Sequence, residues 1–182
     1  MDLTFIEKEY VKNVYDNIAP HFNGKRIYTW KWILNFINSL QTNSIIYDIG
    51  CGNGRNMNFK EHTFIGIDNC KKFIEICKNN GYLVLESSML QINLPDNSAD
   101  AILSIASFHH LSTIDNRIKA LKEMKRLLKN NGKILLSVWS INQPSKTRIT
   151  FNKFGDNMVK WDRSHLRYYY IFQLIELIYL FI

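Results

Sequence analysis

The sequence predicts an α/β fold in which a central, mostly parallel sheet carries helices on both faces. Two observations predict it. Short apolar runs alternate along the chain with segments whose apolar residues recur every three or four positions, which is the pattern of strands alternating with amphipathic helices. The first of these apolar runs also leads directly into a glycine-rich turn, as in nucleotide-binding α/β domains. With 182 residues, the chain has the length of one compact domain.

The N-terminal half supplies a helix, two strands and a second helix. Apolar residues at steps of three and four predict an amphipathic helix over about 28–40. Residues 44–49 are almost continuously apolar, which favours a parallel strand covered on both faces. Residues 63–68 predict the second strand. The helix expected over 71–80 should end at Gly81, a residue suited to a left-handed stop.

Three more strands continue the alternation. Residues 82–86 predict the third strand, and 99–105 the fourth. The helix that follows should bury one apolar face, made of Ile114, Ile118, Leu121, Met124 and Leu128. Asn130-Asn131-Gly132 should end this helix, and 133–139 predict the fifth strand. Strands and helices in this order imply parallel strands joined by right-handed crossovers.

Charge and cysteine content limit the class of protein. The formal charge of +7 arises from 23 Lys and Arg against 16 Asp and Glu, and it favours phosphate-bearing partners without identifying them. The three cysteines are an odd number at unrelated spacings, with no Cys/His metal pattern, so we expect reduced thiols and no metal site. The N-terminus lacks the basic region and long apolar core of a secretory signal, so we expect a cytoplasmic protein.

The glycine-rich turn indicates a nucleoside cofactor. It reads Asp48-Ile49-Gly50-Cys51-Gly52-Asn53-Gly54, and its glycines let the backbone approach a ligand at the end of the first strand. The spacing differs from the dinucleotide fingerprint, and Asp48 disfavours a pyrophosphate while suiting a cationic amino acid group. Asp68, at the end of the second strand, can accept both hydroxyls of a ribose. These features favour S-adenosylmethionine over NAD, and Cys51 is interpreted as a packed loop residue.

Two adjacent histidines follow the fourth predicted strand. His109 and His110 should lie at the carboxyl edge of the sheet, where ligands of open α/β folds bind. Paired histidines serve as a base, as metal ligands or in packing, and the absence of further ligands at suitable spacing disfavours a metal. We expect one histidine to face the cleft and the other to pack.

Five stretches together resemble the eukaryotic tRNA wobble-uridine carboxymethyl methyltransferases, including the methyltransferase domain fused to some AlkB-type oxygenases. They are residues 14–22 with Arg26 and Trp30, residues 48–54, 104–113 and 138–143, and the late Arg-Tyr-Tyr segment 167–172. The first, third and fifth discriminate this family, because nearly all methyltransferases of this class share the glycine loop.

The resemblance implies a Rossmann-like class I methyltransferase that methylates the carboxylate of 5-carboxymethyluridine in tRNA, with a small zinc-binding activator subunit as partner. A carboxylate needs no proton removal before it attacks, so His109 is expected to position the substrate. Arg26, with His21, is expected to hold the carboxylate or a neighbouring phosphate. Trp30 and Trp139 either flank a splayed base or pack in the core.

The expected site residues form three groups. The catalytic group is His109, Arg26 and His21. The cofactor group is Asp48, Gly50, Gly52, Asn53, Gly54, Asp68, Ser88 and Ile105. The substrate group is Tyr15, Arg26, Trp30, His110, Trp139, Arg167 and Tyr168. In this interpretation 1–182 is one domain, in which helices of 1–43 contribute to the substrate site, 44–139 form the cofactor-binding core and 140–182 are a shortened C-terminal part.

The sequence departs from the family pattern at two places. Ser88 stands where the family has an acidic residue that contacts the adenine amino group; Glu86 is the alternative acceptor. Residues 168–182 predict a core helix rather than a membrane span, since they fall short of about 20 apolar residues. A helix there leaves the fifth strand an open edge, whereas the aromatic and β-branched residues of 170–182 permit a last strand.

Two other functions remain open from the sequence. A methyltransferase acting on small acids or phenols needs only the shared cofactor loop, and its activity would depend on neither RNA nor salt. A catalytically weak or inactive module, in which the fold survives as a binding scaffold, is favoured by Ser88 and by the short C-terminal part.

Overall fold

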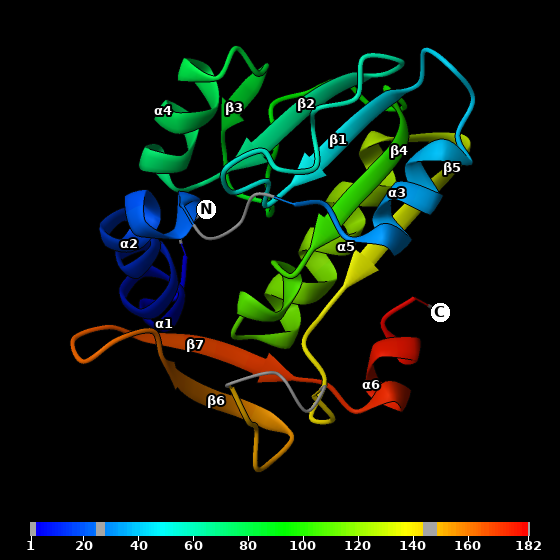
Figure 1. Ribbon diagram of the computed structural model, residues 1–182. Helices are drawn as coiled ribbons and strands as arrows, with labels where there is room; N and C mark the ends of the chain where they lie inside the picture. The colour runs from blue at the N-terminus through cyan, green and yellow to red at the C-terminus, as the bar shows by residue number, and fades with distance from the viewer. Residues whose placement is uncertain (1–2, 25–27, 144–148, 182) are drawn as a thin grey trace.

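A five-stranded parallel sheet forms the centre of the molecule in the computed structural model, which describes residues 3–24, 28–143 and 149–181 (Figure 1). The strands lie in the order β3-β2-β1-β4-β5, and every neighbouring pair is parallel. Their bounds are β1 Ile45–Ile49, β2 Thr63–Asp68, β3 Val84–Glu86, β4 Ala99–Ile105 and β5 Leu128–Ser137. The predicted α/β class and parallel sheet are confirmed.

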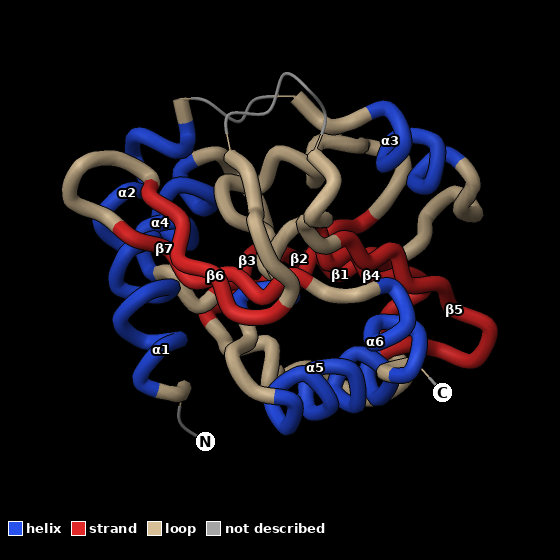
Figure 2. Tube along the Cα trace, turned by 90° about the horizontal axis from the view of Figure 1, so that it is seen from below, coloured by secondary structure: helices blue, strands red, loops and turns tan. Residues whose placement is uncertain are grey.

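Helices cover both faces of this sheet, as Figure 2 shows. The bounds are α1 Phe5–Glu7, α2 Asn13–Asn23, α3 Lys31–Asn38, α4 Lys71–Asn79, α5 Ile114–Leu127 and α6 Leu174–Tyr179, with a π-helical segment at Lys8–Lys12 and a 3-10 turn at Phe108–His110. Helices α3 and α4 pack on one face through Ile33, Ile37 and Cys77. On the other face, α5 packs through Met124 and Leu127.

The predicted elements of the N-terminal half are largely confirmed. Helix α3 is shorter than the predicted span 28–40, because Trp30 has an extended backbone (φ −72°, ψ 145°) and precedes the first helical residue. Helix α4 ends one residue before the predicted bound of 71–80. Gly81 follows it with φ +78°, as expected for a left-handed stop.

The predicted buried face of α5 is partly wrong. Ile114 is 53% exposed and Ile118 is 39% exposed, whereas the helix buries Ala120 and Arg117. The helix also ends at Leu127 rather than at the predicted Asn130-Asn131-Gly132 turn, because β5 begins at the next residue, Leu128. Pairing of β5 with β4 shifts its register between Ala99 and Ala101, so the residues of that turn become an irregular part of the strand.

The core helix predicted for 168–182 is wrong. Residues Leu166–Ile171 form β7, which pairs antiparallel with β6, Gly155–Lys160, in a separate two-stranded sheet. Three consecutive tyrosines and an isoleucine suit a half-buried strand better than a helix. Only 174–179 are helical, and α6 leaves Leu174 74% exposed. Within the described ranges β5 remains the edge of the main sheet, as the open-edge alternative predicts.

The β6–β7 hairpin determines where a ligand site can form. It crosses beneath the carboxyl ends of the parallel strands, next to the N-terminal helices α1 and α2 (Figure 1). Phe151, Val159, Tyr169 and Ile171 give the hairpin a small core of its own. The edge of the sheet at which α/β folds bind ligands therefore faces a second wall contributed by the chain's two ends.

Candidate functional site

A cavity lies at the carboxyl edge of the main sheet, between the glycine loop and the wall formed by α2 and β7. On the loop side its lining includes Gly50, Gly52, Asn53, Asp68, Ser88 and Ile105. Its lining also includes Tyr15, Trp30, His110, Trp139, Arg167 and Tyr169. Most residues expected at the cofactor and substrate therefore share one cavity, although they come from distant parts of the sequence.

The glycine loop lines the cavity with residues in left-handed backbone conformations, which are unfavourable for residues that carry a Cβ. Gly50 has φ +79° and Gly52 φ +55°. A Cβ on Gly50 would lie 2.4 Å from the Cβ of Ser107, whereas a Cβ on Gly52 would meet its nearest atom, in Phe22, at 4.0 Å. Gly54, which we expected at the cofactor, packs instead against the ring of Tyr82 behind the loop. Gly50 therefore shapes the loop, and Gly52 leaves room at its surface.

Asp48 supports the loop from beneath. It is 1% exposed and does not line the cavity, because the loop that follows it covers its carboxylate. Burial raises the pKa of Asp48 to about 7, against the opposing effect of a hydrogen bond from Asn56. Its Oδ2 has no hydrogen-bond partner among the described residues. The predicted direct contact between Asp48 and a cationic group remains a prediction.

Asp68 is placed to hold a nucleoside. Its Oδ2 accepts the backbone N–H of Gly52 at 2.8 Å, and its Oδ1 accepts that of Cys70 at 2.9 Å. The backbone N–H of Asn69 also bonds this carboxylate, which has about four acceptor positions, so the group can still accept a ligand hydroxyl. Burial raises the pKa of Asp68 to about 6, partly offset by the N–H bonds.

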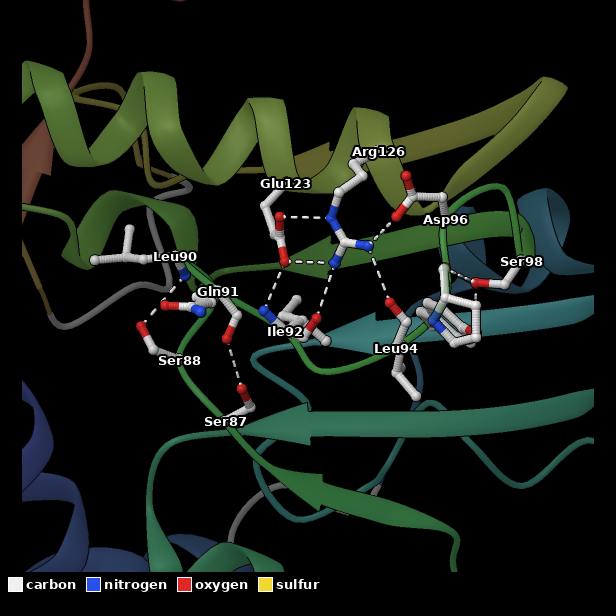
Figure 3. Close-up of polar contacts among 12 residues, drawn as sticks. Ser87, Ser88, Leu90, Gln91, Ile92, Leu94, Asp96, Ser98, Glu123 and Arg126 are labelled. Atoms are coloured by element: carbon white, nitrogen blue, oxygen red, sulfur yellow. Dashed lines mark hydrogen bonds and ion pairs between the residues drawn. The ribbon is translucent and has the colours of Figure 1, made fainter. Parts of the chain in front are cut away.

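Ser88 lies in a loop that is fastened to α5. Its hydroxyl accepts the backbone N–H of Leu90 at 3.2 Å and lines the cavity, while Glu86 is exposed and lies outside the lining. Figure 3 shows how the loop is held: Arg126 donates to the carbonyl oxygens of Ile92 at 2.8 Å and Leu94 at 2.9 Å. Ser87 and Ser88, not Glu86, are therefore the polar residues of the loop after β3 that line the cavity.

One histidine faces the cavity and the other packs, as expected: His110, expected at the substrate, lines the cavity, whereas His109, expected to be catalytic, does not. His110 lines the cavity, and its Nε2 lies 3.0 Å from the Tyr15 hydroxyl. His109, which we expected to position the substrate, is fully buried. It stacks on Tyr169 with ring centres 4.8 Å apart and accepts the backbone N–H of Trp139 at 3.3 Å. The 3-10 turn points successive side chains in different directions, which explains why only one of the two histidines reaches the cavity.

Both imidazoles are neutral at physiological pH. Burial lowers the pKa of His110 to about 4, assisted by the positive charge of Arg167 and opposed by a hydrogen bond to the Tyr168 carbonyl. Burial holds the pKa of His109 well below its usual value, and its interactions with the adjacent His110 imidazole and with the positively charged Arg167 lower it further. Neither group therefore adds positive charge to the cavity.

Strand β7 presents alternate residues to the cavity. Arg167 and Tyr169 line it, but Tyr168, which we expected at the substrate, points to the other side of the strand and donates its hydroxyl to Asp156. Tyr168 therefore does not line the cavity, and the substrate contact expected of it stays a prediction. Sequence reasoning missed Tyr169, although the two-residue period of a strand would have identified it once 166–171 was recognised as extended.

Of the two remaining predicted residues that the structure describes, Trp30 lines the cavity and His21 does not. Trp30 lines the cavity and is 38% exposed; it stacks on Trp32 at 5.7 Å between ring centres. The guanidinium of Arg55, another lining residue that sequence reasoning missed, lies 4.2 Å from the Trp30 ring centre. His21 packs edge-on against Trp161 and does not line the cavity. Arg26 lies outside the described residues.

Cys51, Cys70 and Cys77 are free and buried, so Cys51 is a packed loop residue as interpreted from the sequence. Across residues 3–24, 28–143 and 149–181, no group of three or more His, Cys, Asp or Glu side chains is arranged to hold a metal ion. In the same ranges, no helix is long and apolar enough to cross a membrane.

Comparison with known proteins adds the family. Residues 47–136 match the family model described as a methyltransferase domain. Over 158 residues the chain is 40% identical to the tRNA (carboxymethyluridine(34)-5-O)-methyltransferase of Schizosaccharomyces pombe, covering 85% of this chain and 68% of that protein. Over 146 residues it is 40% identical to the protein of the same name from Arabidopsis thaliana, covering 80% of this chain but 36% of that protein. The chain thus spans about a third of the plant relative's length.

Solved structures share the fold. A SAM-dependent methyltransferase from Aquifex aeolicus has a TM-score of 0.58 and 21% identity, covering 72% of this chain and 77% of that chain. A chain of the complex between the Haloferax volcanii Trm112 methyltransferase activator and a methyltransferase has a TM-score of 0.55 and 17% identity, covering 66% of this chain and 57% of that chain. At these identities the likeness concerns the fold alone.

Proposed function

The chain belongs to the family of the tRNA (carboxymethyluridine(34)-5-O)-methyltransferases, and from this membership we propose that it transfers a methyl group from S-adenosylmethionine to the carboxylate of 5-carboxymethyluridine at the tRNA wobble position. One observation carries the proposal. A single cavity joins the glycine loop and Asp68 to His110 and Arg167, which belong to the stretches that distinguish this family by sequence.

The lining residues fit the cofactor. Asp68 keeps acceptor capacity for a ribose hydroxyl, and Gly52 leaves the loop surface clear. The hydroxyl of Ser88 offers an acceptor to the adenine amino group, weaker than the carboxylate of relatives that carry one. S-Adenosylmethionine supplies an electrophilic methyl group on a positively charged sulfur.

On the substrate side, the protein orients the acceptor and excludes water. No residue needs to remove a proton, because the attacking carboxylate is already an anion, and the neutral His110 is consistent with this chemistry. Tyr15, His110 and Tyr169 close the cavity with rings and a short hydrogen-bonded chain, which favours an in-line approach. Trp30 and Trp139 offer ring faces to a base that leaves the anticodon stack.

Two partners follow from the proposal. The acceptor is tRNA, whose backbone suits the formal charge of +7. A small zinc-binding activator subunit is the second, because one structure with this fold is a complex with the Trm112 methyltransferase activator. We propose that the chain works with such a subunit.

The test is mass spectrometry of tRNA nucleosides after incubation with S-adenosylmethionine, with and without the activator. The expected product is the methyl ester of 5-carboxymethyluridine at position 34. Asp68→Ala should abolish it by removing the ribose acceptor, while Lys60→Ala on the exposed surface should not. Absence of the ester with and without the activator would refute the proposal.

The same protein samples separate the two alternatives. A small-molecule methyltransferase would methylate free acids or phenols with no requirement for RNA and little response to salt. An inactive scaffold would release no S-adenosylhomocysteine with any acceptor, and calorimetry would then show whether it still binds the cofactor.

A further inference from the structure

Two arginines of the described chain are almost fully buried, and they differ in how their charge is satisfied. Arg117 is 5% exposed and donates to the carbonyl oxygens of Leu111 at 3.1 Å and Ser112 at 3.4 Å. Arg167 is 3% exposed and lines the cavity, but its Nε has no hydrogen-bond partner within the described part of the chain. Its Nη1 donates to the Tyr15 hydroxyl at a long 3.3 Å.

The groups around Arg167 supply no counter-charge. His110 Nδ1 lies 2.6 Å from the Tyr168 carbonyl oxygen, which can only accept, so Nδ1 carries the proton. His110 Nε2 is then an acceptor, and the Tyr15 hydroxyl donates a hydrogen bond to it at 3.0 Å. The Tyr15 oxygen is therefore left to accept from Arg167. Every member of this chain of hydrogen bonds is neutral except the guanidinium.

Aromatic rings compensate the charge only in part. The guanidinium carbon of Arg167 lies 4.7 Å from the ring centre of Trp161 and 5.2 Å from that of Tyr169. Such contacts stabilise a cation less than a carboxylate does, and no carboxylate in the ranges that the structure describes lies within ion-pair distance of Arg167. A buried guanidinium that has no carboxylate partner and lies at the wall of a ligand cavity indicates a binding site for an anionic ligand.

We propose that Arg167 is the receptor for the carboxylate of the acceptor nucleoside and makes the site specific for an acid over a neutral amide. This inference rests on the proposed function. A guanidinium also binds phosphate, but a phosphodiester continues into a sugar on both sides and cannot be enclosed easily at a residue that is 3% exposed. A carboxylate at the end of a one-carbon arm can be enclosed.

The assignment also accounts for turnover. A carboxylate oxygen forms a bond to the methyl carbon, the carbon–sulfur bond breaks with its electron pair going to sulfur, and no proton moves. The product ester is neutral, so Arg167 loses its counter-ion when the reaction is complete. The site should therefore hold the acid more tightly than the ester, which favours product release.

Binding to two RNAs tests the proposal directly. Anticodon stem-loops carrying 5-carboxymethyluridine or its neutral analogue 5-carbamoylmethyluridine would be titrated against the protein with its activator subunit and S-adenosylhomocysteine, so that no transfer occurs. The wild type should prefer the acid by about tenfold or more, as expected for charge-assisted hydrogen bonds. Arg167→Met should bind both RNAs alike while keeping its affinity for S-adenosylhomocysteine.

Arg117→Met is the matched control, because it removes the other buried guanidinium without touching the cavity. It should lose stability and keep the preference for the acid. Arg167→Gln, which retains a donor for Tyr15, repeats the comparison in case Arg167→Met does not fold. Folding of each variant is checked by circular dichroism.

The outcomes separate this inference from the function on which it rests. If the wild type methylates the acid, but Arg167→Met and Arg167→Gln still bind the acidic RNA more tightly than the amide RNA, the inference is overturned and the function stands. If the variants bind both RNAs more weakly by the same factor, and their RNA affinity depends less on salt, Arg167 contacts a phosphate and the carboxylate assignment is overturned. If the wild type neither binds nor methylates the acid, both proposals fall.

Discussion

Replacing Gly50 by alanine should destabilise the protein more than the same change at Gly81, although both glycines have nearly the same backbone conformation. Their φ values are +79° and +78°. A left-handed conformation costs a residue with a Cβ about 1–2 kcal/mol, and this cost applies to both positions. At Gly81 nothing lies within 4 Å of the added Cβ, so this should be the whole effect.

At Gly50 the added Cβ also meets the side chain of Ser107, at 2.4 Å from its Cβ and 2.6 Å from its Oγ. Ser107 cannot turn away freely, because its hydroxyl donates to the Ile49 carbonyl at 3.0 Å and contacts the Ser104 hydroxyl at 3.0 Å. Overpacking of this kind costs about 1–3 kcal/mol more. Gly50→Ala should therefore lose about 2–5 kcal/mol of unfolding free energy.

Urea unfolding followed by circular dichroism measures both losses. Adding Ser107→Gly to Gly50→Ala should recover at least about 1 kcal/mol beyond additivity, since the two side chains then no longer collide. Equal losses in the two single variants, or strict additivity in the double variant, would show that the contact with Ser107 does not explain the need for glycine at this position.

Three further predictions concern the cavity and its supports. Gly52→Ala should be about as stable as Gly81→Ala, because the added Cβ meets no close neighbour in the protein. It should bind S-adenosylmethionine at least about tenfold more weakly, because this Cβ occupies space at the cavity wall that the cofactor would use. An unchanged affinity in calorimetry would contradict this. Cofactor affinity should rise about tenfold from pH 5 to pH 7, since ligand hydroxyls favour the ionised form of Asp68, whose pKa in the empty protein is about 6. The same raised pKa means that the folded protein without cofactor holds a proton that the unfolded chain has released, so this group makes the unfolding free energy fall as pH rises from about 4 to 6. Asp68→Asn should remove the trend in affinity and reduce the trend in unfolding free energy, to which Asp48, with a pKa of about 7, also contributes. Arg126→Leu should cost about 1–3 kcal/mol, because the carbonyl oxygens of Ile92 and Leu94 lose their donors, and hydrogen exchange should increase in the loop around them but not in β1.

The cofactor half of the site was predictable because its signals are local. The glycine turn and Asp68 each follow a strand whose apolar run is visible in the sequence, and parallel strands bring their ends to one edge. The face of α5 was harder to predict, because the buried Arg117 replaces an apolar residue and the tertiary contacts of β7 decide which side is covered. Periodicity reports hydrophobicity, and here a guanidinium packed on the Tyr170 ring occupies a core position.

The substrate half was predictable as a set of segments but not as a set of side chains. Which of His109 and His110 reaches the cavity depends on a single 3-10 turn, and which of Tyr168 and Tyr169 does so depends on the register of β7. A shift of one residue exchanges the faces of a strand, and the sequence of three tyrosines contains nothing to fix that register.

Hydrogen bonds of Tyr168, which does not line the cavity, fix the register of β7. The Tyr168 hydroxyl donates to Asp156 on β6, and the Tyr168 carbonyl accepts His110 Nδ1–H at 2.6 Å. Because one residue bonds to both the hairpin and the turn after β4, its neighbour Arg167 has little freedom to move relative to Tyr15 and His110. Tyr168 is thus a positioning residue: Tyr168→Phe should weaken the preference for an acidic acceptor while leaving cofactor affinity unchanged. An unchanged preference would mean that the main-chain pairing of β6 with β7 alone holds Arg167 in place.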